Sequence, residues 1–343
     1  MPPPLRGTAR RSRFATLVLV LACACGTPAR AQSYWLTPSP GSLDYLDLTG
    51  PEWLARIDGE IRVIQFYLQH LLPHRFEIVG PNTYAAFVAR DAFRHINGRG
   101  IAIAMEAGVV KSFWCDDVDA RAAFATSSEA IRNVQAAGAR VDYVSMDEPF
   151  VAGVQSCRML DARVADRTVS YMKAMRRAFP STQIGLTEAY PLFGVDDHAR
   201  FDMLLRERGG PLDFYHLDVH LSVALEQKRL ADIERDVGRL GAYLENKGVP
   251  FGLIIWGADG RSDFLYTEEA MKLVRLTRNA FRGAGRLPSH VPLQSWTPTP
   301  EGLLIVPRNL RPEDEGTHLN LLRRTKACLE SGEGCAEPTY PSR

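Results

Sequence analysis

Residues 230–256, LADIERDVGRLGAYLENKGVPFGLIIW, hold a helix pattern that runs directly into a strand pattern. An amphipathic helix is predicted by apolar residues at the helical spacing i, i+3, i+4, i+7, here Leu230, Ile233, Val237, Leu240 and Leu244. Gly248 follows as a helix-ending glycine, and the apolar run 251–256 predicts a strand. One helix-to-strand unit of an α/β protein is therefore visible in 27 residues.

The same alternation recurs along most of the chain. Strands are predicted for eight short apolar or β-branched runs, at 61–68, 76–79, 101–106, 142–147, 183–188, 213–219, 251–256 and 291–295. Helices are predicted between them at 84–96, 120–137, 160–179, 230–244 and 268–281. Eight such units close into a (β/α)₈ TIM barrel, which we expect as a single domain over residues 32–310.

An open, doubly wound parallel sheet is the alternative architecture. Such sheets commonly bind phosphate through glycine-rich loops, and the chain contains neither GxGxxG after a strand nor GxxxxGK[ST]. The barrel is therefore favoured. Thr49 and Pro51 predict a short helix that closes the lower end of the barrel ahead of its first strand.

Residues 1–31 have the pattern of a signal peptide. Three arginines at 10, 11 and 13 precede an apolar run from Phe14 to Ala24, and Ala29-Arg30-Ala31 forms a small-x-small cleavage site. The apolar run is shorter than the roughly 20 residues that a membrane span needs, and the sequence after it contains no second apolar run of that length. We expect a periplasmic or secreted protein, monomeric and without a membrane span.

The charge of the chain depends on that segment. The formal net charge is +1, but five of the 41 basic residues and no acidic residue lie in 1–31, so 36 basic and 40 acidic residues remain. A mildly acidic chain lacks the basic surface of a nucleic-acid-binding protein, so we expect no nucleic-acid partner.

Four of the six cysteines lie outside the expected signal peptide, at Cys115, Cys157, Cys328 and Cys335. An even number in an oxidising compartment predicts two disulfides. Cys328 and Cys335 are a natural local pair in a polar tail, 311–343, expected at the surface. Cys115 and Cys157 follow neighbouring predicted strands, so their bridge would join two loops of one barrel end.

Active sites of TIM barrels lie at the carboxyl ends of the strands. Those ends carry a set of polar and aromatic residues: Gln65, Tyr67, Glu106, Trp114, Asp147, Glu148, Glu188, Asp218, His220, Trp256, Asp259 and Trp296. Glycosidic hydrolysis needs a carboxylic acid and a second carboxylate, and aromatic rings stack on sugars. We therefore expect a carbohydrate substrate and no cofactor.

The run Val144-Ser145-Met146-Asp147-Glu148-Pro149 resembles the strand-4 motif of clan A glycoside hydrolases, in which an Asn-Glu-Pro sequence holds the acid/base glutamate. The resemblance extends in outline over residues 61–296, with Trp296 where those enzymes commonly have a tryptophan. It implies that Glu148 is the proton donor. The chain departs from the pattern at Asp147, which replaces the asparagine, and at the end of strand 7, which lacks the nucleophilic glutamate.

The second carboxylate is left open by this departure. Asp218, Glu188 and Asp259 are candidates, and Asp218 is the preferred partner. Other sugar-cleaving barrels carry an aspartate nucleophile on strand 4 and an aspartate acid on strand 6, which would give these roles to Asp147 and Asp218.

Two other functions are compatible with the same residues. A carbohydrate-binding barrel without catalysis would explain the missing glutamate of strand 7. A metal-dependent hydrolase would use Asp218 and His220, which share one face of a strand, although the partner HxH sequence on strand 1 is missing and no metal is expected.

Overall fold

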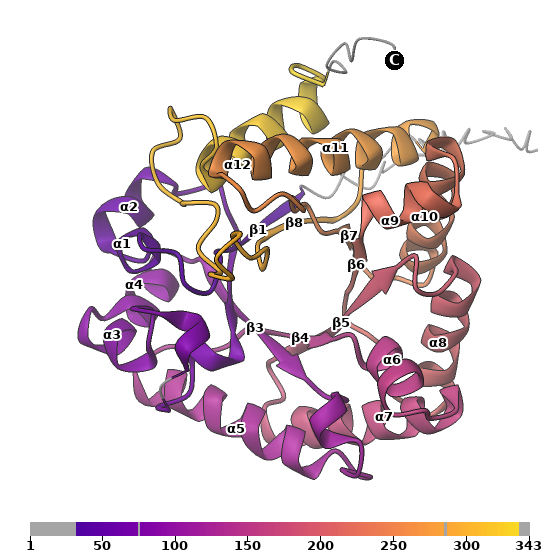
Figure 1. Ribbon diagram of the computed structural model, residues 1–343. Helices are drawn as coiled ribbons and strands as arrows, with labels where there is room; N and C mark the ends of the chain where they lie inside the picture. Colours follow the sequence, from indigo (N-terminus) through magenta and orange to yellow (C-terminus); the bar gives the residue numbers. More distant parts are fainter. Residues whose placement is uncertain (1–31, 75, 285–286, 336–343) are drawn as a thin grey trace, which may run out of the picture. The chain divides into compact units, whose positions relative to one another are not determined.

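The computed structural model describes residues 32–74, 76–284 and 287–335 as a closed barrel of eight parallel strands surrounded by helices (Figure 1). The strands follow the chain order and are β1 Ser33–Thr37, β2 Val63–Tyr67, β3 Ala102–Gly108, β4 Tyr143–Asp147, β5 Gln183–Tyr190, β6 Tyr215–Val219, β7 Phe251–Leu253 and β8 His290–Gln294. β1 closes the ring by pairing with β8 through five residues. The predicted TIM barrel is therefore confirmed; the expected signal peptide lies outside the described residues.

Longer helices form the outer layer. They are α5 Arg121–Ala136, α7 Asp161–Ala178, α8 Val195–Glu207, α10 Leu230–Asn246 and α11 Asp263–Phe281. Shorter helices lie in the connections: α1 Tyr45–Leu48, α2 Pro51–Arg56, α3 Tyr84–Ala89, α4 Ala92–Gly98, α6 Pro149–Val151, α9 Leu221–Gln227 and α12 His318–Lys326. Gly138 and Gly248, which follow α5 and α10, have φ values of 81° and 75°, a left-handed conformation that glycine adopts at low cost.

The first strand was missed by the sequence prediction, and one predicted strand is wrong. Ser33–Thr37 is β1, whose Trp35 and Leu36 are fully buried. A strand was expected at residues 76–79, but Glu77–Val79 form a 3₁₀ turn that ends at Gly80 with φ 53°. The expected short helix around Pro51 is α2, which connects β1 to β2 instead of preceding the first strand.

The chain after Leu310 also differs from the expected surface tail. His318–Lys326 form α12, and its Leu319, Leu321 and Leu322 belong to the main hydrophobic core. Burial of one leucine-rich face fixes this helix beside α11 (Figure 1).

The lower part of the barrel interior is filled by aromatic rings. Trp35 lies 5.3 Å from Phe214 and 5.0 Å from His290 between ring centroids. His290 Nδ1 lies 3.0 Å from Nε2 of His216, within hydrogen-bond distance. This packed layer leaves the carboxyl ends of the strands as the accessible end of the barrel interior.

Candidate active site

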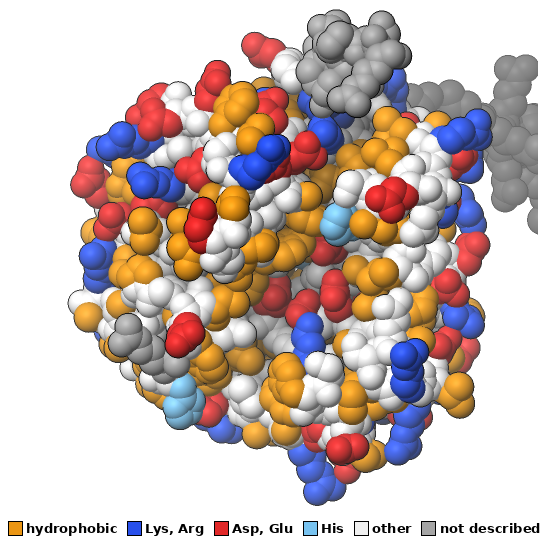
Figure 2. Space-filling model, in the orientation of Figure 1, with side chains coloured by type: hydrophobic (Ala, Val, Ile, Leu, Met, Phe, Trp, Pro, Cys, Tyr) orange, Lys and Arg blue, Asp and Glu red, His pale blue; other side chains and the backbone are white. Residues whose placement is uncertain are grey.

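A cavity of about 190 Å³ opens at the carboxyl ends of the strands. It is lined by Tyr67, Glu106, Asp147, Glu148, Asp218, Ile254 and Trp296. Figure 2 shows acidic side chains gathered in the central hollow of this face, with apolar side chains around them. Four carboxyl groups from three different strands or strand ends thus share one small space.

Glu148 lies directly after β4, in an unusual backbone conformation. Its φ and ψ are 46° and 45°, in the left-handed region that non-glycine residues rarely adopt. The neighbouring side chain of Asp147 lines the same cavity, because the left-handed turn interrupts the strand alternation that would send the two to opposite faces. Strained backbone of this kind is often found at functional sites.

The environment of Glu148 favours its protonated form. Burial, followed by repulsion from Asp147, raises the pKa of Glu148 to about 7, against the opposing effect of Lys111. A carboxyl group with this pKa holds its proton near neutral pH, as a general acid requires.

Asp218, on β6, is the second carboxyl group available for chemistry. Burial and then repulsion from Glu148 raise its pKa well above the ordinary value. Its Oδ1 atom is buried and makes no hydrogen bond to any described residue. The Trp256 indole beside it lowers this pKa in part, although the two groups do not meet the geometry of a regular hydrogen bond, and Trp256 Nε1 has no other described partner.

Asp147 is held by Lys111, which the sequence prediction missed. The ammonium group of Lys111 forms an ion pair with Oδ2 of Asp147. Gly108 at the end of β3 makes room for this side chain, since a Cβ atom there would lie 2.9 Å from Cγ of Lys111. A single lysine in a loop gives no pattern from which this contact could be predicted.

Glu106 is oriented by two glutamines. Gln294 Nε2 donates to Oε2 of Glu106 at 2.5 Å, and Gln65 Nε2 lies 3.4 Å from Oε1 of Gln294. Gln65 itself is buried and does not line the cavity, so it lies behind the carboxyl group. Burial, followed by repulsion from Asp147, raises the pKa of Glu106 well above its usual range.

Glu188 does not line the cavity. Its side chain is fully buried and accepts two backbone hydrogen bonds, from Phe150 N at 2.6 Å and from Val151 N at 3.2 Å. Both of its oxygens are therefore occupied by the first turn after Glu148.

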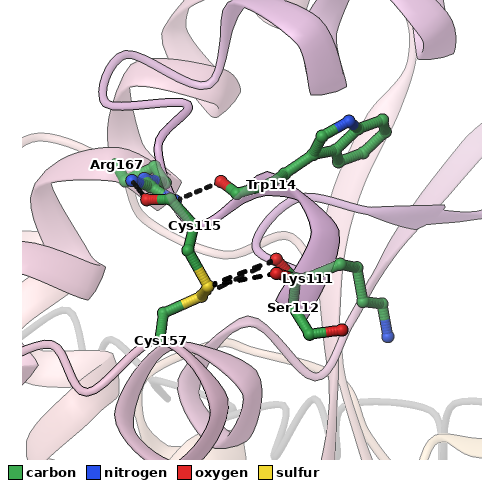
Figure 3. Close-up of a disulfide and its surroundings, with 6 residues drawn as sticks. All are labelled: Lys111, Ser112, Trp114, Cys115, Cys157 and Arg167. Carbon is green, nitrogen blue, oxygen red and sulfur yellow. Dashed lines mark hydrogen bonds between the residues drawn. A yellow bond between two sulfur atoms is a disulfide. The ribbon is translucent and has the colours of Figure 1, made fainter.

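The aromatic residues fall into two groups. Trp296 lines the cavity and its ring lies 4.6 Å from that of Trp256, which in turn contacts His220 edge-on at 5.3 Å. Trp114 lies in the loop after β3 and contacts Phe113 at 4.9 Å. Its carbonyl oxygen accepts a hydrogen bond from Arg167, while its ring points away from the disulfide (Figure 3).

Asp259 and His220 are not part of the cavity lining. Asp259 forms an ion pair with Arg261 and borders a separate surface hollow. His220 is exposed, with Nδ1 3.2 Å from the Ser222 hydroxyl. Over the described ranges, no three His, Cys, Asp or Glu side chains are grouped to bind a metal ion.

Both expected disulfides are present. Cys115 joins Cys157, with Cα atoms 5.2 Å apart, and Cys328 joins Cys335. The first bridge connects the loop after β3 to the turn Ala152–Ser156 after β4. Its sulfur atoms lie 3.3–3.9 Å from the carbonyl oxygens of Ser112 and Lys111 (Figure 3). The disulfide therefore packs directly against the backbone that carries Lys111.

Comparison with known proteins gives the fold and no family. No protein-family model matches the chain, and no curated protein matches it in sequence. A glucosidase from Croceicoccus marinus superimposes with a TM-score of 0.50 at 12% identity, over 88% of this chain and 68% of the glucosidase. Xylanase10C from Cellvibrio japonicus, solved with xylopentaose, superimposes with a TM-score of 0.50 at 10% identity, over 79% of this chain and 59% of the xylanase.

These matches confirm the resemblance at the level of the barrel fold. The chain spans somewhat more than half the length of the xylanase, and its TIM barrel is of the kind found in solved glycoside hydrolases. Because barrels carry many chemistries, the function is argued from the cavity.

Proposed function

We propose that this protein is an exported glycoside hydrolase that cleaves a poly- or oligosaccharide by two-carboxylate catalysis. The observation that carries the proposal is that Glu148 shares a small cavity with Asp218. Burial and repulsion from Asp147 raise the pKa of Glu148 there to about 7. Trp296 lines the cavity, and aromatic rings in such positions can stack on sugar rings.

Glu148 is the general acid in this mechanism. It protonates the leaving glycosidic oxygen, and the departing sugar develops positive charge at its anomeric carbon. Asp218 in its ionised form acts on that carbon, either as a nucleophile whose covalent intermediate water then hydrolyses or as a base that takes a proton from the attacking water. A protonated Glu148 favours this ionised form, because it removes the Glu148 charge that helps to raise the pKa of Asp218. Glu188 and Asp259 do not line the cavity, and Asp147, which does, is paired with Lys111, so Asp218 remains the preferred partner.

Export is part of the same proposal. The signal-like residues 1–31 and two disulfides fit an oxidising compartment, the periplasm or the exterior. The described residues contain no helix of the length and apolarity that a membrane crossing needs.

The experiment is a screen of the purified protein against a panel of polysaccharides, with Glu148→Gln and Asp218→Asn beside the parent. We expect the parent to release reducing ends from at least one member, and each variant to lose at least about 10²-fold in kcat. Treatment with a chelator is expected to leave this rate unchanged. Glu148→Gln with near-parent activity would overturn the assignment of the acid.

A second function has one observation in its favour. Ile254, which directly follows β7, gives the cavity an apolar lining, and no glutamate ends this strand, where clan A enzymes have their nucleophile. A carbohydrate-binding barrel needs no such group. Binding of a polysaccharide without any release of reducing ends would establish this function in place of hydrolysis.

A further inference from the structure

The short helix after Glu148 lacks the usual cap. α6 begins with Pro149, and Glu148 is its N-cap residue, yet the Glu148 side chain makes no capping hydrogen bond. The first N–H groups of a helix have no partner within the helix, and a side chain at the N-cap position normally accepts from them. A carboxylate at that position has both the chemistry and the location to do so.

The cap is supplied from the neighbouring strand. Glu188, on β5, accepts from the N–H groups of Phe150 and Val151 through separate oxygens, at 2.6 and 3.2 Å. It is fully buried, and β5 holds it beside β4, where Asp147 pairs with Thr187. The Glu148 N–H donates to the carbonyl oxygen of Thr187 at 2.9 Å, so the residue before Glu188 fixes the Glu148 backbone as well.

We infer that Glu188 is a positioning residue that caps α6 in place of Glu148 and thereby leaves the Glu148 carboxyl group free to face the cavity. This inference rests on the proposed role of Glu148 as the acid. In Glu188→Gln the amide oxygen can accept from only one of the two N–H groups, so the other buried N–H loses its acceptor, and Glu148 is the nearest carboxyl group in sequence that can replace it. A carboxylate that accepts backbone N–H groups is stabilised in its charged form, so its pKa falls.

Titration of Glu148 in Glu188→Gln tests this. Carbon-13 labelling of glutamate side-chain carboxyl groups, with the Glu148 signal assigned by its loss in Glu148→Gln, gives the pKa directly. We expect about 7 in the parent and a value lower by at least about one unit in Glu188→Gln. In parallel, kcat is expected to fall by at least about tenfold with KM within about twofold, because orientation and protonation of the acid change more than substrate binding does.

Glu245→Gln is the matched control. Glu245 Oε1 also accepts two backbone N–H bonds, from Phe251 at 3.2 Å and Ser289 at 3.3 Å, at the opposite end of the barrel. We expect this variant to lose stability and to keep both the pKa of Glu148 and kcat. A folded Glu188→Gln protein with an unchanged Glu148 pKa would overturn the inference.

Glu188→Asp separates capping from charge, because Glu188→Gln also removes a charge that repels Glu148, and this loss alone would lower the Glu148 pKa. It also covers the case in which the glutamine variant does not fold. The aspartate keeps the charge, but its shorter side chain reaches at most one of the two N–H groups. We therefore expect a smaller shift of the Glu148 pKa in the same direction. An unchanged Glu148 pKa would contradict the inference. The titration requires no turnover, so a parent protein without glycosidase activity would refute the proposed function and leave this test valid.

Discussion

Lys111, in the loop after β3, forms an ion pair with Asp147, the last residue of β4. Both groups are about three-quarters buried, with side-chain exposures of 24% and 25%. Partial burial reduces screening by water, so a charge at this position acts strongly on its neighbours. Among these is Glu148, whose pKa is raised by Asp147 and lowered by Lys111.

Replacement of Lys111 by methionine is therefore expected to raise the pKa of Glu148 above about 7. The loss of the cation removes an interaction that favours the charged carboxylate, while the repulsion from Asp147 persists. Since kcat/KM of the proposed hydrolase requires protonated Glu148, the alkaline limb of its pH profile is expected to move upward by about 0.5–1 unit. The measurement is kcat/KM from pH 4 to 10 in buffers of constant ionic strength.

Lys173→Met is the control for this prediction. Lys173 is exposed on α7, donates to the carbonyl oxygen of Arg208 and does not line the cavity. Its removal changes the net charge equally and is expected to leave the alkaline limb in place. A downward movement in Lys111→Met would show that Lys111 does not act on Glu148 through its charge.

The raised pKa of Glu148 also predicts a gain in stability when its charge is removed. The folded pKa of about 7 lies above the ordinary value of 4.5, so the folded state binds this proton more tightly than the unfolded state. Stability from this group is present at low pH and is lost as the pH rises through about 7. The glutamine in Glu148→Gln does not ionise, so the variant avoids this loss of stability at high pH.

Urea unfolding at pH 5 and pH 8 measures the effect. We expect Glu148→Gln to exceed the parent in free energy of unfolding at pH 8 by on the order of 1–3 kcal/mol, with a smaller difference at pH 5. Glu52→Gln, on the exposed surface of α2, is the control for removal of one negative charge. If Glu148→Gln were less stable than the parent at pH 8, the buried charge of Glu148 would not destabilise the folded protein, which contradicts the prediction.

The location of the carboxyl groups was predictable because parallel strands of a barrel end on one face. Any residue at the carboxyl end of a strand, such as Glu106, Glu148 or Asp218, is brought to that face whatever the loops do. The periodicity of the seven correctly predicted strands was sufficient to find them. β1 was missed because Ser33–Thr37 directly follows the signal-like segment, without a preceding helix to mark its start.

The roles of individual groups were less predictable, because they depend on loop conformation. Glu188 ends its predicted strand and Asp218 lies one residue before the end of its own, but the turn at Pro149 directs two N–H groups at Glu188. Asp259 appeared at the end of strand 7, and its own loop pairs it with Arg261. Such contacts require three-dimensional placement of residues that no local sequence pattern connects.

The disulfide between Cys115 and Cys157 gives the last prediction. Replacement of both cysteines by serine is expected to lower the free energy of unfolding by about 4 kcal/mol, from the chain entropy of a 42-residue loop. The same change at Cys328 and Cys335, which close 7 residues, is expected to cost about 2 kcal/mol. Reversible urea unfolding under non-reducing conditions measures both.

Activity separates the two bridges more sharply than stability does. The Cys115–Cys157 sulfurs contact the backbone of Lys111, so their loss frees the loop that holds Lys111 against Asp147. Arg167 still donates to the carbonyl oxygens of Trp114 and Cys115, which limits the movement. We therefore expect a lower kcat/KM and a raised alkaline limb in the first serine pair, as in Lys111→Met, and neither change in the second. Equal activity in both pairs would show that Arg167 alone suffices to hold Lys111 in place.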